Sequence, residues 1–155
     1  MKPIVLFYVL FGLSAAWAGD CPDLSGKYKT IDDNGRDSLS EIKQNGCKSI
    51  FHSNLTSKDN WALQLDGVPR FVGDDGLPKS TSEKHQDNWV SAKFDGKTLI
   101  FSVYSASSSG HPASIPKAKV KLFKRADGNL NFTLLDLDTS GKVTTTKTSI
   151  AIRTH

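Results

Sequence analysis

The sequence contains four histidines, and their spacing shows whether the chain has the pattern of a metal site or of a catalytic base. His52, His85, His111 and His155 form no HxH or HExxH motif, and none lies beside a cysteine. Zinc sites usually draw two ligands from one short segment, which these spacings do not provide. His85 and His111 fall in two long polar segments, and we interpret them as loop residues. We therefore expect no metal site and no cofactor.

Serines are frequent in the segment 105–116, but no nucleophile motif surrounds them. Neither GxSxG nor SxxK, the patterns that frame a reactive serine, occurs there. A pair of catalytic carboxylates is positioned by the fold rather than by a local motif, so the sequence neither favours nor excludes one. We predict no catalytic residues and a protein that is not an enzyme, with an enzyme as the third alternative.

Residues 1–18 have the pattern of a signal peptide. Lys2 supplies a positive charge, the run 4–13 is apolar, and Ala16-Trp17-Ala18 has the small-x-small pattern of a cleavage site. The apolar run is shorter than the roughly 20 residues that a membrane-spanning helix needs. We expect cleavage between Ala18 and Gly19, a secreted or periplasmic protein, one domain over 19–155, and no integral membrane segment in the mature chain.

Cys21 and Cys47 are the two cysteines of the chain. In an exported protein such a pair favours one disulfide, and the absence of a CxxC motif argues against a metal or redox site. We predict that this disulfide holds residues 19–24 against the edge of a sheet.

The rest of the sequence alternates short apolar runs with Gly, Asp and Asn turns, and no window has the spacing of an amphipathic helix. Asn45-Gly46 is the strongest hairpin signal, because both central residues of such a turn need a positive φ. Leu39 and Ile42 are three positions apart, which breaks strict alternation and predicts a β-bulge. The expected strands are 26–32, 38–44, 47–52, 60–66, 68–72, 88–94, 97–104, 117–125, 130–136 and 142–153.

Consecutive strands joined by short turns, without crossover helices, favour an antiparallel meander. Such a sheet has two exposed edges, and closing it into a barrel removes them. We predict an all-β fold, an antiparallel up-and-down β-barrel of about 8–10 strands, with a two-sheet β-sandwich as the alternative.

Alternation places a set of apolar side chains inside this barrel, and three of the larger ones also carry a polar group. Such side chains suit a guest molecule that is partly apolar. The predicted ligand-binding residues are Tyr28, Trp61, Phe71, Trp89 and Phe101. The other predicted interior residues are Leu63, Leu65, Val103, Leu122, Phe132 and Ile150.

The start of the first strand, LSGKY at 24–28 with Cys21 just ahead of it, resembles the Gly-x-Trp opening of the calycins, the group of lipocalins, fatty-acid-binding proteins and avidins. The spacing Cys-x-x-Leu-x-Gly-Lys-aromatic is most similar to the avidin opening, and Arg153 could correspond to the arginine that packs over the first-strand aromatic in lipocalins. The resemblance implies a barrel with a cavity. Tyr28 replaces the tryptophan, and the turn 32–35 does not match the polar residues with which avidins hold biotin, so biotin binding is not implied.

The chain is weakly basic, and we predict no nucleic-acid partner. The formal net charge is +4, and acidic residues are interspersed among the lysines. The densest basic run, 117–125, is interpreted as the solvated face of a strand, with a surface for an anionic polymer or membrane as the alternative. We predict an exported, non-catalytic protein that binds a small amphipathic ligand in a calycin-like barrel. The alternative is a solid-barrel interaction module that recognises a protein or glycan through loops 73–87 and 105–116, and the oligomeric state stays open.

Overall fold

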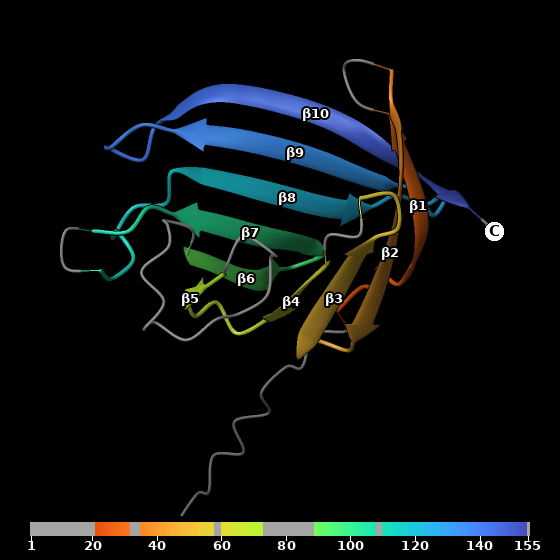
Figure 1. The fold of residues 1–155 in the computed structure, drawn as a ribbon, viewed down its shortest axis with the longest axis horizontal. Helices are drawn as coiled ribbons and strands as arrows, with labels where there is room; N and C mark the ends of the chain where they lie inside the picture. The colour runs from red at the N-terminus through yellow and green to blue at the C-terminus, as the bar shows by residue number, and fades with distance from the viewer. Residues whose placement is uncertain (1–20, 32–34, 58–59, 73–88, 108–109, 155) are drawn as a thin grey trace, which may run out of the picture.

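The computed structural model describes residues 21–31, 35–57, 60–72, 89–107 and 110–154. The strands follow one another as β1 (Gly26–Ile31), β2 (Asp37–Asn45), β3 (Ser49–Asn54), β4 (Asn60–Gln64), β5 (Arg70–Phe71), β6 (Trp89–Asp95), β7 (Thr98–Tyr104), β8 (Ala118–Lys124), β9 (Leu130–Leu137) and β10 (Val143–Thr154) (Figure 1). They form one 10-stranded antiparallel sheet, and these ranges contain no helix, which confirms the predicted all-β fold. The expected signal peptide, 1–18, and the loop 73–87 lie outside the described residues.

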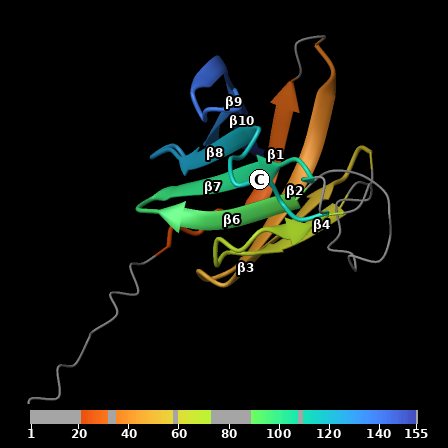
Figure 2. The same ribbon diagram turned by 90° about the vertical axis from the view of Figure 1, so that its left-hand side faces the viewer.

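The first and last strands are neighbours in the middle of the sheet. The strand order is β4-β3-β2-β1-β10-β9-β8-β7-β6-β5, and Tyr28 of β1 pairs with Arg153 of β10. Figures 1 and 2 show the sheet curling round, which brings β4 close to β6. Consecutive strands otherwise lie side by side, as expected for an up-and-down arrangement.

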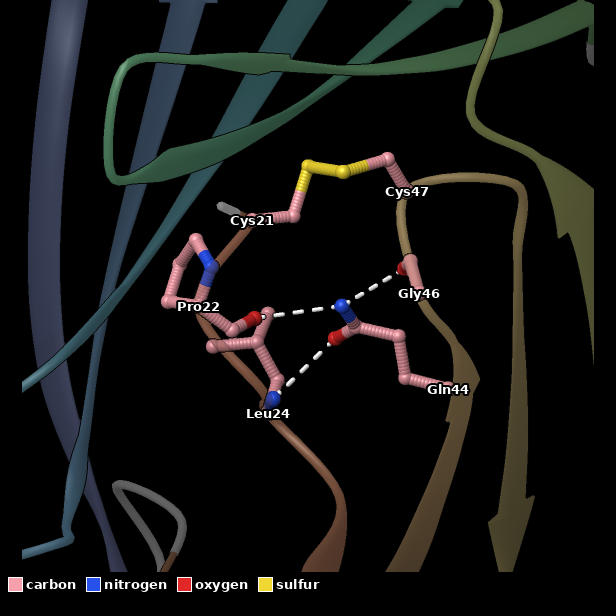
Figure 3. The surroundings of a disulfide bond; sticks show 6 residues. All are labelled: Cys21, Pro22, Leu24, Gln44, Gly46 and Cys47. Atoms are coloured by element: carbon pink, nitrogen blue, oxygen red, sulfur yellow. Dashed lines mark hydrogen bonds between the residues drawn. A yellow bond between two sulfur atoms is a disulfide. The ribbon is translucent and has the colours of Figure 1, made fainter. Parts of the chain in front are cut away.

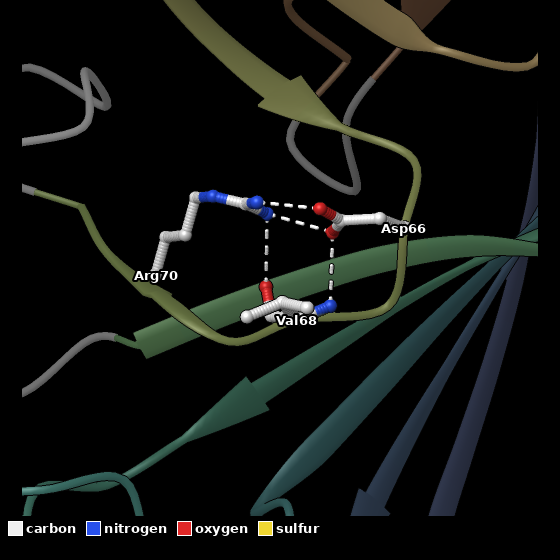
Figure 4. Close-up of polar contacts among 3 residues, drawn as sticks. All are labelled: Asp66, Val68 and Arg70. Atoms are coloured by element: carbon white, nitrogen blue, oxygen red, sulfur yellow. Dashed lines mark hydrogen bonds and ion pairs between the residues drawn. The ribbon is translucent and has the colours of Figure 1, made fainter.

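The two ends of the curled sheet meet at one point rather than along a ladder. Asp66, just after β4, forms a single bridge with Lys93 of β6, and the Gly67 N–H donates to the Ala92 carbonyl at 2.9 Å. The turn that makes this contact is held by the Asp66 carboxylate, which accepts hydrogen bonds from both terminal nitrogens of Arg70 at 2.7 and 2.5 Å (Figure 4). The sheet is therefore barrel-like, but its hydrogen bonding is not continuous around the barrel.

The inner face of the sheet is apolar and well buried. Leu99 and Leu130 are 0% exposed, and burial of such a side chain contributes about 1.5–3 kcal/mol to stability. The prediction for β10 is wrong by one position, because Ala151 is 0% exposed whereas Ile150 is 46% exposed. Ala151 pairs with Leu130, and directly opposed residues share a face, so the buried Leu130 fixes which residues of β10 point inward.

Strand β2 runs without the predicted bulge. Its pairing with β1 and with β3 is continuous, so Leu39 and Ile42 lie on opposite faces and only Ile42, at 3% exposure, belongs to the core. The prediction is wrong because it placed both apolar residues on the inner face. The irregular register lies instead in β10, between Val143 and Thr145.

Residues just before β1 are held against β2 by the predicted disulfide. Cys21 and Cys47 are joined, with Cα atoms 5.5 Å apart. The Gln44 side chain adds hydrogen bonds, since its Oε1 accepts from the Leu24 N–H at 3.0 Å and its amide nitrogen donates to the Pro22 carbonyl at 3.1 Å (Figure 3). The segment lies beside an interior strand and not at the predicted sheet edge, because the edge strands are β4 and β5.

The LSGKY segment forms a tightly packed corner at the start of β1. Leu24 is 0% exposed and Tyr28 is 1% exposed, and the Tyr28 hydroxyl donates to the Leu24 carbonyl at 2.9 Å. Gly26 lies between them with φ at +155°, and a Cβ on it would meet the Tyr28 hydroxyl and Arg153 Nε at 3.2 Å. The glycine is therefore required both by its backbone conformation and by the close approach of the tyrosine ring.

Candidate functional site

An apolar cavity of about 260 Å³ lies on the inner face of the sheet. Aliphatic and aromatic side chains from β2, β3, β4 and β6 to β9 form its wall, together with Val72 just after β5. The imidazole of His52 is the one titratable group among the described residues that line it. A wall of this composition can exclude water from an apolar molecule but offers it few hydrogen bonds.

Three rings form one corner of this cavity. His52 and Trp61 are directly opposite each other on β3 and β4, and their rings stack with centroids 4.8 Å apart and planes 14° apart. Phe101 of β7 meets Trp61 edge-on, with centroids 5.3 Å apart and an interplanar angle of 81°. Stacked and edge-to-face contacts both hold aromatic side chains in fixed positions. Trp61 therefore contacts one ring from its neighbouring strand β3 and one from β7, in the other arm of the curled sheet.

His52 is held in an environment that disfavours its charged form. Its Nδ1 is buried and has no hydrogen-bond partner among the residues that the structure describes. Burial lowers the pKa of His52 below its ordinary value of 6.5, because the imidazolium ion would lose hydration without gaining a partner. The imidazole is thus neutral at neutral pH, and the described wall of the cavity carries no net charge.

The structure brings two of the five predicted ligand-binding residues together, since Trp61 and Phe101 both line the cavity. Tyr28 does not line it, because its ring is packed in the corner at the start of β1, where burial raises the pKa of its hydroxyl. Phe71 and Trp89 pair across β5 and β6, with ring centroids 5.9 Å apart, and neither lines the cavity.

Phe71 and Trp89 lie outside the cavity wall because of the register of β5 and β6. Their chain neighbours Val72 and Val90 line the cavity, and successive side chains of a strand point to opposite faces. The sequence does not show how these strands pair, so it does not show which of their faces is the inner one. The larger side chains were therefore predicted to face the interior. Sequence reasoning also missed His52 as a wall residue, although His52 is two positions after Ile50, which is 2% exposed.

The described residues contain no group of three or more His, Cys, Asp or Glu side chains that could hold a metal ion. The same part of the chain has no helix that is long and apolar enough to cross a membrane.

Comparison with known proteins identifies a fold but no family. No known protein family matches the sequence, and no curated protein is similar to it. Among the solved structures that match is a mutant of the REP1-NXSQ fatty acid transporter, with a TM-score of 0.51 and 17% sequence identity, covering 85% of this chain and 98% of that chain. The two chains share a fold. The likeness agrees with the barrel-like all-β fold, whereas the resemblance of the first strand to the calycin and avidin openings stays a prediction.

Proposed function

We propose that this chain is an exported, non-catalytic protein that binds a small, partly apolar molecule in the cavity beside Trp61. The observation that carries the proposal is the apolar hollow of about 260 Å³ on the inner face of the sheet, beside the buried core. Its volume is close to the lower end of the range of about 300–1,000 Å³ for small-molecule sites. A barrel interior of this size either is filled by side chains or holds one small ligand, and a hollow favours the second.

The wall also limits the chemistry of the guest. Most of it is apolar, so the buried part of the ligand should be apolar as well. His52 and the indole N–H of Trp61 are uncharged hydrogen-bonding groups, which suit at most a neutral polar atom on that part of the ligand. The fold shared with a fatty acid transporter supports a lipid-like guest, since that protein carries a molecule of this kind.

Export is supported by the disulfide. Disulfides persist in oxidising compartments, and Cys21–Cys47 joins a segment directly after the predicted signal peptide to the β2–β3 turn. The proposal assigns no catalytic role, and His52 is the one titratable group among the described residues that line the cavity. A filled barrel would have favoured the interaction module, and the hollow makes that alternative the weaker one.

The proposal is tested by calorimetric titration of the mature protein with decan-1-ol, a neutral single-chain probe. We expect saturable binding that Trp61→Ala weakens by about tenfold, which is about 1.4 kcal/mol. Trp89→Ala is the matched control, because Trp89 lies outside the cavity wall, and it should change the affinity less than about twofold. Circular dichroism checks that each variant is folded. No saturable binding to the unmodified protein, or equal losses in the two variants, would contradict the proposal.

A further inference from the structure

A second hollow, of about 430 Å³, lies where β1 and β10 separate. The two strands pair only at one end, where the last pair along β1 is Lys29 opposite Ile152. Strand β10 nevertheless continues to pair with β9 as far as Val143. Figure 1 shows β10 running on beside β9 while β1 and β2 take another direction. The hollow is therefore a side opening of the barrel. Thr30 of β1 borders it on one side, and residues 147–149 of β10 border it on the other.

This opening adjoins the apolar cavity. Val120 and Phe132 line both hollows. Their strand partners confirm that both point inward, since Phe132 pairs with Leu122, which is 3% exposed, and Val120 is packed against the same core. A molecule that enters beside β10 thus meets two side chains that also belong to the wall of the inner cavity.

The opening differs from the cavity in carrying a cation. Lys147 pairs with Leu134, which in turn pairs with Val120, so all three side chains rise from the inner face. Ser149, two positions along β10, pairs with Phe132 and lies on the same face. Lys147 and Ser149 thus lie at the edge of the opening, and the side chains deeper inside are apolar. This arrangement suits an amphiphile, which has a polar head and an apolar tail.

The ammonium group of Lys147 has no internal counter-ion among the described residues. The ion pairs that the structure records there involve other lysines and arginines. Asp136, on the same face of β9 and paired with Thr145, is the carboxylate closest to Lys147 in the register, and no ion pair between the two is recorded. An exposed lysine at the edge of an apolar hollow attracts anions and repels cations.

We infer that the opening between β1 and β10 takes the anionic head group of a single-chain amphiphile whose tail lies in the inner cavity, with Lys147 as the counter-ion. This inference rests on the proposed function and adds the charge and the orientation of the ligand. The hydroxyl groups of Ser149 and Thr30, which also line the opening, are available as hydrogen-bond donors to the same head group. The head group is a carboxylate or a phosphate, since both accept hydrogen bonds from an ammonium ion.

Titration of the mature protein with three probes of equal chain length tests this inference. Decanoate and decyl phosphate carry the two kinds of anionic head group, and decan-1-ol carries none. We expect Lys147→Glu to weaken binding of at least one anionic probe by about tenfold while changing the affinity for decan-1-ol less than about twofold. The anionic probe that the unmodified protein binds more tightly, and that Lys147→Glu weakens, identifies the head group. Its affinity should also fall as salt is raised, because the opening is exposed.

Lys121→Glu is the matched control. Lys121 is an exposed residue of β8, and its neighbour Leu122 is 3% exposed, so Lys121 points away from the interior. The substitution Lys121→Glu changes the net charge of the protein by the same amount as Lys147→Glu. It should change the affinity for the anionic probes less than about twofold. Equal losses in the two variants would overturn the inference, because the effect would then come from overall charge.

The remaining outcomes separate this inference from the proposed function. If decan-1-ol binds but no anionic probe responds to Lys147→Glu, the head-group inference fails and the cavity proposal stands. If Lys147→Glu weakens decan-1-ol as much as the anionic probes, Lys147 acts on the shape of the site and not on charge, and the inference is again overturned. If decan-1-ol shows no saturable binding to the unmodified protein, the proposed function fails, and the inference fails with it.

Discussion

His52 stacks face to face on Trp61, at 4.8 Å between ring centroids, although its buried Nδ1 has no hydrogen-bond partner among the described residues. The pair thus combines a favourable aromatic contact with an unsatisfied polar atom in an apolar wall. Burial of a hydrogen-bonding atom without a partner usually costs about 1–3 kcal/mol. The cavity therefore keeps a group that weakens the fold, as expected where a residue serves binding rather than stability.

Replacing the imidazole by an apolar ring should stabilise the protein. His52→Phe keeps an aromatic ring against Trp61 and removes the buried nitrogen, and we expect the free energy of unfolding to rise by about 1 kcal/mol. Urea denaturation followed by circular dichroism measures the change. His52→Ala is the comparison, because it removes the nitrogen together with the stacking and should lower stability. A His52→Phe protein that is less stable than the unmodified one would show that Nδ1 has a partner after all.

His52 also gives the stability a pH dependence of known sign. Its pKa is lowered in the folded state, so the unfolded chain binds a proton more readily as the solution becomes acidic. The contribution of His52 is fully present above its unfolded pKa of about 6.5 and is lost as the pH falls through the folded pKa. We expect the stability difference between His52→Phe and the unmodified protein to grow from pH 7.5 to pH 5. A difference that stays constant over this range would contradict a lowered pKa.

The strand order could be predicted from the sequence because turns are encoded locally. Gly46 has φ at +53°, as the Asn45-Gly46 signal requires, and the hairpin between β2 and β3 forms there. The Cys21–Cys47 disulfide was predicted because the chain offers no other pairing. Signals of this kind need only a few consecutive residues, and they were enough to predict that consecutive strands form antiparallel hairpins.

The face that each strand presents could not be predicted where both faces carry apolar residues. In β10, Ala151 is buried and Ile150 exposed, and the choice depends on Leu130, the partner of Ala151 on the neighbouring strand β9. Val72, just after β5, and Val90 of β6 face the cavity instead of their larger aromatic neighbours. A shift of one residue moves every side chain of a strand to the other face, and the sequence alone does not contain the register.

Gly26, in the LSGKY segment, should be important for stability, because its surroundings leave little room for a side chain. Gly26→Ala would place a methyl group 3.2 Å from the Tyr28 hydroxyl at a φ of +155°, and we expect it to lower the free energy of unfolding by about 2 kcal/mol. Gly46→Ala is the control, because Gly46 also has a positive φ but nothing lies within 4 Å of its added Cβ. It should cost only about 1 kcal/mol. Urea denaturation compares the two, and an equal or smaller loss in Gly26→Ala would show that the corner yields without strain.

The disulfide and Gln44 hold the same segment by different means, and their contributions can be separated. The disulfide closes a loop with a sequence separation of 26 residues, for which the chain-entropy model gives about 3 kcal/mol. We therefore expect Cys21→Ser combined with Cys47→Ser to lower stability by about this amount, mainly through the unfolded state. The Tyr28 hydroxyl should still find the Leu24 carbonyl, because Gln44 continues to bind the segment.

Gln44→Ala should act on the folded state instead. It removes the acceptor of the Leu24 N–H and the donor to the Pro22 carbonyl, and we expect it to lower stability by about 1–2 kcal/mol with the disulfide intact. Amide hydrogen exchange at Leu24 distinguishes the two variants, since it should quicken in Gln44→Ala and change little in the double serine variant. Faster exchange at Leu24 in the serine variant alone would mean that the disulfide, and not Gln44, positions the segment that closes over Tyr28.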